Sequence, residues 1–274
     1  MGGWDAENKG WVYIAEFTKL NPDWFVQLQA VAQGQWSGWN LSTSAGRTAL
    51  DNALADIVDA AGEREDRFAE ILHQRDAEGC ITYWMGMLGI ESAKHPNTYQ
   101  LIRVARKLGE MVVMCLKEAF DAARASQICP AIVPAFDPPR TASYPAGHAL
   151  QSYLISYLLL RVMPKMEQTA QSNKPVTWEE PHNGLFALAR RVADNRVIAG
   201  VHFDIDNKAG FFIAKKIDEW FDAWLPETDQ NAFDILVKAA KKEFPQWAKK
   251  PESLSRKRNR ALVGKKVAAR RKRV

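Results

Sequence analysis

Two cations with a helical spacing are the first residues of this chain that could do chemistry. Lys117 and Arg124 lie seven residues apart in "KEAFDAAR", an interval close to two turns of an α-helix. If one helix carries both, the two cations project from the same face and repel each other unless an anion lies between them. For this fragment alone, two solvated surface charges are the simpler interpretation.

The fragment "SYPAGHAL" combines a turn with a histidine. Pro145, Ala146 and Gly147 lead into a helix that is predicted to begin near His148. The free N–H groups and the positive dipole end of such a helix favour an anion, and a glycine allows its close approach to the backbone. His148 could exchange a proton beside this anion. A purely structural turn is an equally good interpretation of the fragment by itself.

The fragment "NRVIAGVHFDID" places Arg196, His202 and Asp206 in the pattern R-x5-H-x3-D. In a helix, His202 and Asp206 are one turn apart, so the carboxylate can bond to the imidazole and fix its tautomer. A histidine with a carboxylate behind it can be a nucleophile, a base or a metal ligand. A surface His–Asp pair would show the same spacing.

The elements that must position these residues are helices. Apolar residues recur with helical spacing, and no segment alternates like a strand. We predict an all-α fold with helices in residues 42–76, 95–125, 148–163, 183–225 and 231–244. Five prolines between residues 126 and 145 predict an irregular link or a lid, where Asp137 and Arg140 are candidates for the mouth of a pocket. His73, His95 and His182 have no partner spacing that indicates ligation.

Composition divides the chain into three parts. Residues 1–40, which include Trp4, Trp11, Trp24 and Trp36, are expected to be an arm that packs on the core. Residues 41–250 form the predicted helical domain, and residues 251–274 form a basic tail. Residues 256–274 hold ten Lys and Arg, which leaves 27 basic and 32 acidic residues elsewhere, so the body is mildly acidic. We do not expect nucleic acid as a partner, because the tail lacks interleaved aromatic residues.

Other features of the chain indicate its compartment. Its longest apolar run, residues 152–163, is too short for a membrane span and contains Arg161. The first residues show no apolar core of a secretory signal. Cys80, Cys115 and Cys129 are odd in number and have no metal-site spacing, which favours free thiols. We therefore expect a cytoplasmic protein without an integral membrane span.

In chain order the three fragments read K-x6-R, P-x-G-H and R-x5-H-x3-D, and with them the chain resembles the superfamily of type 2 phosphatidic acid phosphatases, class A acid phosphatases and vanadium haloperoxidases. The resemblance covers residues 117 to 206 and implies a helical bundle of the acid phosphatase/vanadium haloperoxidase type. Three positions depart from the family pattern, which has Pro at Ala125, Ser at Ala146 and Ser at Asn195. Without the Ser hydroxyl at Ala146, oxyanion binding loses about 1 kcal/mol.

The resemblance also implies roles for individual residues. His202 would attack phosphorus to form a phosphohistidine while Asp206 orients its ring, and His148 would protonate the leaving alkoxide and then activate water. No metal ion is needed for this chemistry. The transferred group would be held by Lys117, Arg124, Arg196 and the backbone at Ala146 and Gly147.

The motifs leave three functions open. The first is hydrolysis of a soluble phosphate ester by a homodimeric phosphatase, which the chain length favours. The second is a haloperoxidase in which vanadate, bonded to His202, oxidises halide with peroxide; the segment from Asn195 to Gly210 is closer to this type. The third is a non-catalytic phosphate-binding or assembly protein that uses its basic tail.

Overall fold

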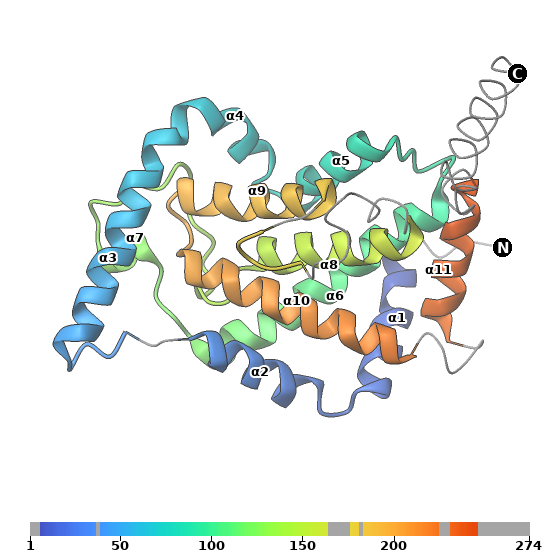
Figure 1. Cartoon of the computed structure of the whole chain (residues 1–274), viewed down its shortest axis with the longest axis horizontal. Coiled ribbons are helices and arrows are strands. Elements are labelled where there is room, and N and C mark those ends of the chain that lie inside the picture. The colour runs from blue at the N-terminus through green and yellow to red at the C-terminus, as the bar shows by residue number, and fades with distance from the viewer. Residues whose placement is uncertain (1–5, 37–38, 164–175, 181–182, 225–230, 246–274) are drawn as a thin grey trace, which may run out of the picture.

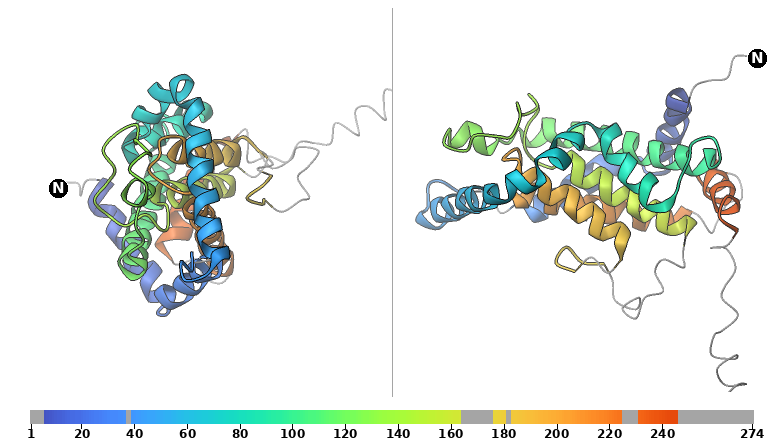
Figure 2. Two further views of the ribbon diagram at one scale, coloured as in Figure 1. Left: turned by 90° about the vertical axis from the view of Figure 1, so that its left-hand side faces the viewer. Right: turned by 90° about the horizontal axis from the view of Figure 1, so that it is seen from above.

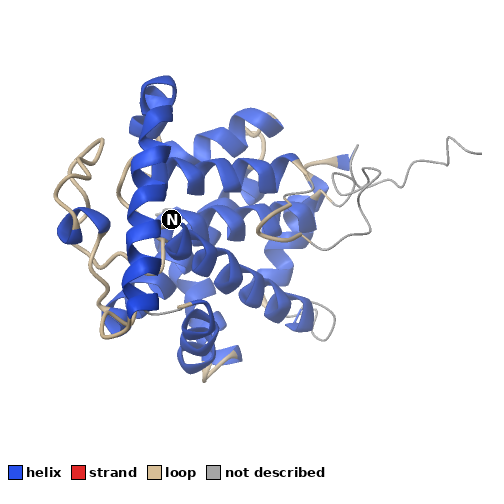
Figure 3. Cartoon of the chain, turned by 60° about the vertical axis from the view of Figure 1, so that its left-hand side comes forward, coloured by secondary structure: helices blue, strands red, loops and turns tan. Residues whose placement is uncertain are grey.

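The computed structural model of the chain describes residues 6–36, 39–163, 176–180, 183–224 and 231–245. All regular elements in these ranges are helical (Figure 3), which confirms the predicted all-α class. The α-helices are α1 (Ala6–Leu20), α2 (Trp24–Gln35), α3 (Ser44–Ala60), α4 (Arg64–His73), α5 (Ala77–Leu88), α6 (Pro96–Phe120), α7 (Ala125–Ile128), α8 (Gly147–Val162), α9 (Gly184–Ile198), α10 (Asp204–Trp224) and α11 (Ala232–Lys242). A 3₁₀ turn, η1 (Ala61–Glu63), joins α3 to α4. Trp4, His182 and the tail 251–274 lie outside the described residues.

Helix α8 is the centre of the bundle. Its sequence is apolar on nearly every face, as expected for a helix with neighbours on all sides. It packs against α6, α9 and α10 (Figure 1). Arg161, the one cation in its apolar run, lies near its end and donates to the carboxylates of Asp218 and Asp222 on α10. The run is therefore a core helix, as its sequence predicts.

Helices α1 and α2 pack on the bundle from outside. α1 contacts α6, and α2 contacts both α10 and α6. The rings of Trp36 and Tyr144 are 4.6 Å apart between centroids, and the Tyr144 hydroxyl donates to the carbonyl of Ala32 at 2.6 Å. Core packing accounts for Trp24 and Trp36 in these first residues, so no chemistry needs to be assigned to them.

Helix α3 stands across one end of the bundle, on the left in Figure 1 and toward the viewer in the left panel of Figure 2. It packs on η1 and α9, and its apolar side chains join a small cluster apart from the main core. The chain then returns through α4, which packs on α9. This detour brings residues 71–75 to the end of the bundle where α9 ends and where α8 and α10 begin.

The end of α6 differs from the sequence prediction. α6 stops at Phe120 because Asp121 takes the left-handed conformation (φ 42°) and donates its N–H to the carbonyl of Lys117 at 2.9 Å. Arg124 is extended and precedes the short helix α7. The prediction that one helix carries Lys117 and Arg124 on a single face is therefore wrong.

Beyond α7, the proline-rich link up to residue 145 has no regular structure, as its prolines predict. Its first half is tied to α4 and to the end of α9. Arg64 donates to the carbonyls of Val133 at 2.7 Å and of Ile198 at 3.0 Å, and the N–H of Ala135 donates to the carbonyl of Ala199 at 2.9 Å. The link is thus an ordered loop with fixed attachments to α4 and to the end of α9.

Because α10 and α8 pack closely at Gly210, we expect a side chain at this position to lower the stability of the fold. A Cβ added at Gly210 would lie 2.8 Å from the backbone nitrogen of Leu150 and 2.9 Å from the carbonyl oxygen of Ala146. Gly210→Ala is therefore expected to lower the free energy of unfolding by about 1–3 kcal/mol, because the two backbones must move apart. In the control Gly86→Ala, the new Cβ meets no atom within 4 Å. Urea unfolding should show the loss in the first variant alone, and equal stabilities would contradict this account.

Candidate active site

A cavity of about 250 Å³ opens at the end of the bundle where α8 and α10 begin. Three residues from the sequence motifs, His148, Arg196 and His202, share it, although they come from different elements. Its volume is below the usual range for drug-sized ligands, so it suits a small one. The residues that line it are Arg75, Asp76, Phe136, Asp137, Pro139, His148, Arg196, Val201 and His202.

His202 and Asp206 form the predicted pair, but only Asp206 lies in a helix, whereas the sequence analysis considered both residues in one helix. His202 precedes α10, and Asp206 lies in its first turn. The carboxylate accepts a bond from His202 Nδ1 at 3.0 Å and another from the N–H of Phe203 at 3.0 Å. Nδ1 therefore carries the proton, and Nε2 keeps its lone pair. Burial, opposed by the bond to Asp206, lowers the pKa of His202 to about 4, so the ring is neutral at neutral pH.

Ser143 is a site residue that the sequence analysis missed. Its hydroxyl donates to Asp206 Oδ2 at 2.6 Å and lies 3.5 Å from His202 Nδ1. Ser143 is buried, as are both of its partners. This third donor fixes the carboxylate that orients the imidazole. The residue lies 63 positions from Asp206 in the chain, and no spacing rule connects such positions.

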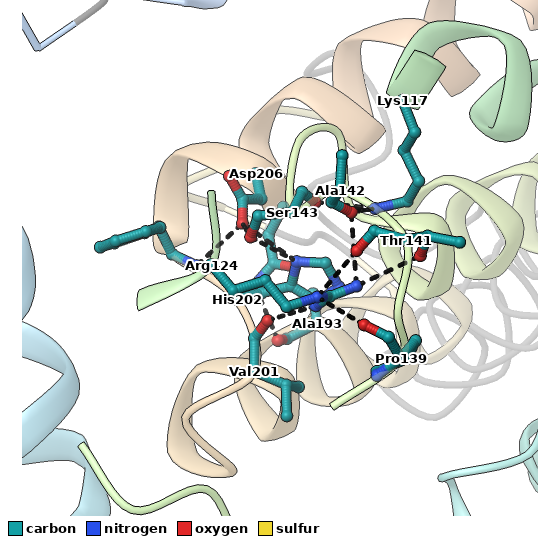
Figure 4. A network of polar contacts seen from close by, with 12 residues as sticks. Lys117, Arg124, Pro139, Thr141, Ala142, Ser143, Ala193, Val201, His202 and Asp206 are labelled. Atoms are coloured by element: carbon teal, nitrogen blue, oxygen red, sulfur yellow. Dashed lines mark hydrogen bonds and ion pairs between the residues drawn. The ribbon is translucent and has the colours of Figure 1, made fainter. Parts of the chain in front are cut away.

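Lys117 and Arg124 are directed at the proline-rich link (Figure 4). Lys117 Nζ donates to the carbonyls of Ala142 and Ser143, the latter at 2.8 Å. Arg124 donates to a further set of backbone carbonyls. Neither cation is among the residues that line the cavity. The backbone acceptors of Arg124 are Pro139 (3.1 Å), Thr141 (3.0 Å), Ala142 (3.3 Å) and Val201 (2.6 Å).

These two cations nevertheless belong to the electrostatics of the site. Burial, and then the charge of Arg124, lower the pKa of Lys117 to about 7, while Asp206 opposes the shift. Burial also lowers the pKa of Arg124, again opposed by Asp206. Both charges in turn disfavour protonation of His202. Lys117, Arg124, His202 and Asp206 therefore influence one another electrostatically, although the two cations donate to backbone carbonyls and do not lie along the cavity, where the motifs predicted that they bind the anion.

Of the three cations in the sequence motifs, Arg196 is the one that lines the cavity. Only 1% of it is exposed, and to the described residues its side chain makes a single hydrogen bond, from Nη2 to the carbonyl of Ile71 at 3.1 Å. Its Nε and Nη1 atoms are buried and have no partner among the described residues. Its guanidinium carbon lies 5.7 Å from the ring centre of Phe136, which also lines the cavity. Burial lowers its pKa to about 10, so it stays charged, and its unbonded nitrogens require an acceptor.

The turn before α8 is built as predicted, with one difference at Ala146. α8 begins at Gly147, and His148 in its first turn lines the cavity. The N–H groups of this first turn have no partner within the helix. The N–H of Ala146, however, donates to the carbonyl of Asp206 at 2.9 Å, so it is already occupied. Of the two backbone groups predicted to bind an oxyanion, the N–H of Ala146 is occupied, while that of Gly147 has no acceptor among the described residues; neither residue is part of the cavity lining.

His148 is neutral and bonded to the backbone. Its Nε2 lies 2.9 Å from the carbonyl of Gln74, so that nitrogen carries the proton and Nδ1 keeps a lone pair. Burial, and then the charge of Arg196, lower its pKa to about 3. In this state His148 can accept a proton through Nδ1.

Among the buried groups at this end of the bundle, positive charge is in excess, although the exposed carboxylates of Asp76 and Asp137 also line the cavity. The buried cations among the described residues are Lys117, Arg124 and Arg196, whereas Asp206 is the one buried carboxylate near them. The other buried carboxylate of the described residues, Asp234, lies on α11 and pairs with a lysine there. Buried charge of one sign is costly unless a counter-charge compensates it. The arrangement therefore favours a bound anion.

Of the other described residues named in the sequence analysis, one lines the cavity and the rest do not. Asp137 lines the cavity, as expected, whereas Arg140 is exposed and is not part of the lining. His73 contacts Tyr83, and His95 stacks on Phe244, so neither takes part in the site. Cys80, Cys115 and Cys129 are free, as predicted.

No family model matches this chain, and no curated protein matches it either. None of the helices in the described ranges combines the length and apolar character that a membrane crossing requires. Within the same ranges, His, Cys, Asp and Glu side chains nowhere gather in a group of three that could hold a metal ion. An anion makes different demands from a metal ion, namely cationic or N–H donors, and Arg75 and Arg196 line the cavity.

Proposed function

We propose that this chain is a phosphoric ester hydrolase that acts through a phosphohistidine intermediate on a small, soluble phosphate ester. The observation that carries the proposal is Arg196: a buried guanidinium with two unbonded nitrogens shares a cavity with His202, whose Nε2 is free and whose Nδ1 is bonded to Asp206. Such a cavity supplies a nucleophile and an anion ligand at one place.

The proposed mechanism follows from these atoms. His202 Nε2 attacks phosphorus, and Asp206 stabilises the positive charge that develops on the ring through the Nδ1 bond. Arg196 and the N–H of Gly147 bind the phosphoryl oxygens, on which charge spreads in the transition state. Lys117 and Arg124 add positive potential from behind the loop that they hold.

The state of His148 indicates which esters react fastest. Because its ring is neutral and its Nε2 proton is donated to the carbonyl of Gln74, its part is in the second step, in which Nδ1 takes a proton from water as a weak base. The first step then receives little help in protonating the leaving oxygen. We therefore expect aryl phosphates, whose leaving groups depart as stable anions, to react much faster than alkyl phosphates.

The same residues fit vanadate, which has the shape and charge of phosphate. Arg196, Gly147 and His202 Nε2 would hold it, and bound vanadate would supply activation of peroxide for halide oxidation. This chain would contribute the positive potential of Lys117 and Arg124 and the proton acceptor His148. Ala146 offers neither a hydroxyl nor a free N–H, which weakens the hold on either anion.

A direct assay tests the proposed function. Purified full-length protein is incubated with an aryl phosphate, and the released phosphate is measured with and without vanadate. Acid-labile, base-stable label on His202 after a rapid quench would support the phosphohistidine. No release from any phosphate ester, together with vanadate- and peroxide-dependent bromination of a diketone, would overturn hydrolysis in favour of the haloperoxidase reaction.

A cytoplasmic location and a homodimer also belong to this proposal. The free thiols support the cytoplasmic location.

The pKa of Lys117, about 7, predicts the pH dependence of the reaction. If the protonated amine supports catalysis, kcat/KM is expected to fall as the pH rises through about 7, because the amine loses its charge there. Lys117→Arg keeps a cation whose pKa is far higher, so this decline should disappear while the ionisation of the substrate stays the same. Identical pH profiles of the two proteins would contradict a charged role for Lys117.

A further inference from the structure

The C-terminal turn of α4 supplies acceptors to two cavity residues. The carbonyl of Ile71 accepts from Arg196 Nη2 at 3.1 Å, and the carbonyl of Gln74 accepts from His148 Nε2 at 2.9 Å. Carbonyls at the end of a helix lack partners within the helix and carry the negative end of its dipole. They therefore favour the charge of Arg196 and the protonated Nε2 of His148. The position of this turn decides where both side chains point.

Gln74 is held in place through its side chain. It is fully buried, its Nε2 donates to Glu70 Oε1 at 2.9 Å, and its Oε1 accepts from Asn195 Nδ2 at 2.8 Å. The Glu70 carboxylate accepts only, so it fixes which end of the Gln74 amide faces Asn195. Arg191 in turn binds Glu70. These bonds join the end of α4 to α9.

Asn195 completes the connection from the α9 side. It is fully buried, and its Oδ1 accepts from Arg67 Nη1 at 3.2 Å while its Nδ2 donates to Gln74. It also directly precedes Arg196 in α9. Both amides are thus bonded at their oxygen and nitrogen, and loss of either side chain leaves a buried polar atom of the other without a partner. Neither side chain lines the cavity, so neither needs to touch a ligand.

We propose that Gln74 and Asn195 are a pair of positioning residues that together hold His148 in its Nε2-protonated tautomer and direct Arg196 into the cavity. This inference deepens the proposed function and rests on it for the catalytic consequence. It also assigns a purpose to Asn195, where the resembling family has a serine: a hydroxyl is too short to reach Gln74 in the same way.

The first test reads the tautomer of His148 without any catalysis. Ring-nitrogen NMR of the full chain, labelled at histidine, is recorded for wild type, Asn195→Ala and Asn231→Ala. Asn231 is a matched control, because it is a buried asparagine that caps α11 with its side chain, far along the chain from the site. We expect the Nε2-protonated signature of His148 in wild type and in the control, and a mixed signature in Asn195→Ala. An unchanged His148 signature in Asn195→Ala would overturn the inference.

The second test measures the consequence for catalysis. At a temperature where all three proteins are folded, kcat for an aryl phosphate is expected to fall about 10- to 100-fold in Asn195→Ala, because misplaced groups lose their transition-state geometry. The control should keep the wild-type kcat. Equal kcat values in the three proteins would overturn the positioning role. If wild type hydrolyses no phosphate ester but the tautomer still shifts in Asn195→Ala, the proposed function fails while the positioning of His148 stands.

Discussion

Replacement of His202 with alanine is expected to reduce phosphate release on the order of 10⁴-fold or more. Among the described residues, no other group that lines the cavity combines a free imidazole nitrogen with a carboxylate behind it. His148 cannot take over the role, because the nitrogen bonded to Gln74 carries its proton and no carboxylate is bonded to its ring. The initial rate on an aryl phosphate and the quenched phosphohistidine label both measure the effect.

The control for this variant is His95→Ala. His95 lies at the start of α6, at the opposite end of that helix from Lys117, and stacks on Phe244. It should lose some stability but no activity. Both variants should keep the helical circular dichroism of wild type, since the buried His202 ring is neutral and its removal leaves Asp206 bonded to Ser143 and Phe203. Substantial activity in the His202 variant would mean that another residue is the nucleophile.

Replacement of Arg196 with methionine is expected to separate binding from stability. In wild type without an anion, the buried guanidinium with two unbonded nitrogens lowers the free energy of unfolding. Methionine is apolar and of similar length, so it removes this destabilisation. The melting temperature of the anion-free variant should therefore equal or exceed that of wild type. Its kcat/KM should nevertheless fall about 10²- to 10³-fold, as after loss of a transition-state donor.

The melting temperature measured with and without an anion tests whether Arg196 binds that anion. Vanadate or phosphate should raise the melting temperature of wild type, because both anions would bind only to the folded state, and should have no such effect on Arg196→Met. A variant that is less stable without anion, yet is still stabilised by vanadate to the wild-type extent, would show that Arg196 has a structural role alone.

The sequence predicted well those features that depend on local pattern. The apolar faces of residues 147–162 required a central helix, and the spacing of His202 and Asp206 required a close contact, although the helix begins only between the two. The motif order placed both histidines and all three motif cations in one site. Of these residues, His148, Arg196 and His202 line one cavity, whereas Lys117 and Arg124 do not.

The features that depend on distant contacts were not predictable. The left-handed turn at Asp121, a residue type that tolerates this conformation, ends α6 before Arg124 and sends both cations toward backbone carbonyls. Helix α5 lacks the polar face that marks a surface helix, and the sequence analysis did not assign it. Ser143 and Gln74 have no local signal at all, because their roles arise from partners 63 and 121 positions away.

A crystal structure of the full chain with orthovanadate tests the central claim most directly. We predict vanadium bonded to Nε2 of His202, with Nε and Nη1 of Arg196 within hydrogen-bond distance of its oxygens and Lys117 and Arg124 behind the loop. Vanadate bound elsewhere, or His202 Nε2 and the two Arg196 nitrogens left without an anion at saturating vanadate, would contradict an oxyanion site at this end of the bundle.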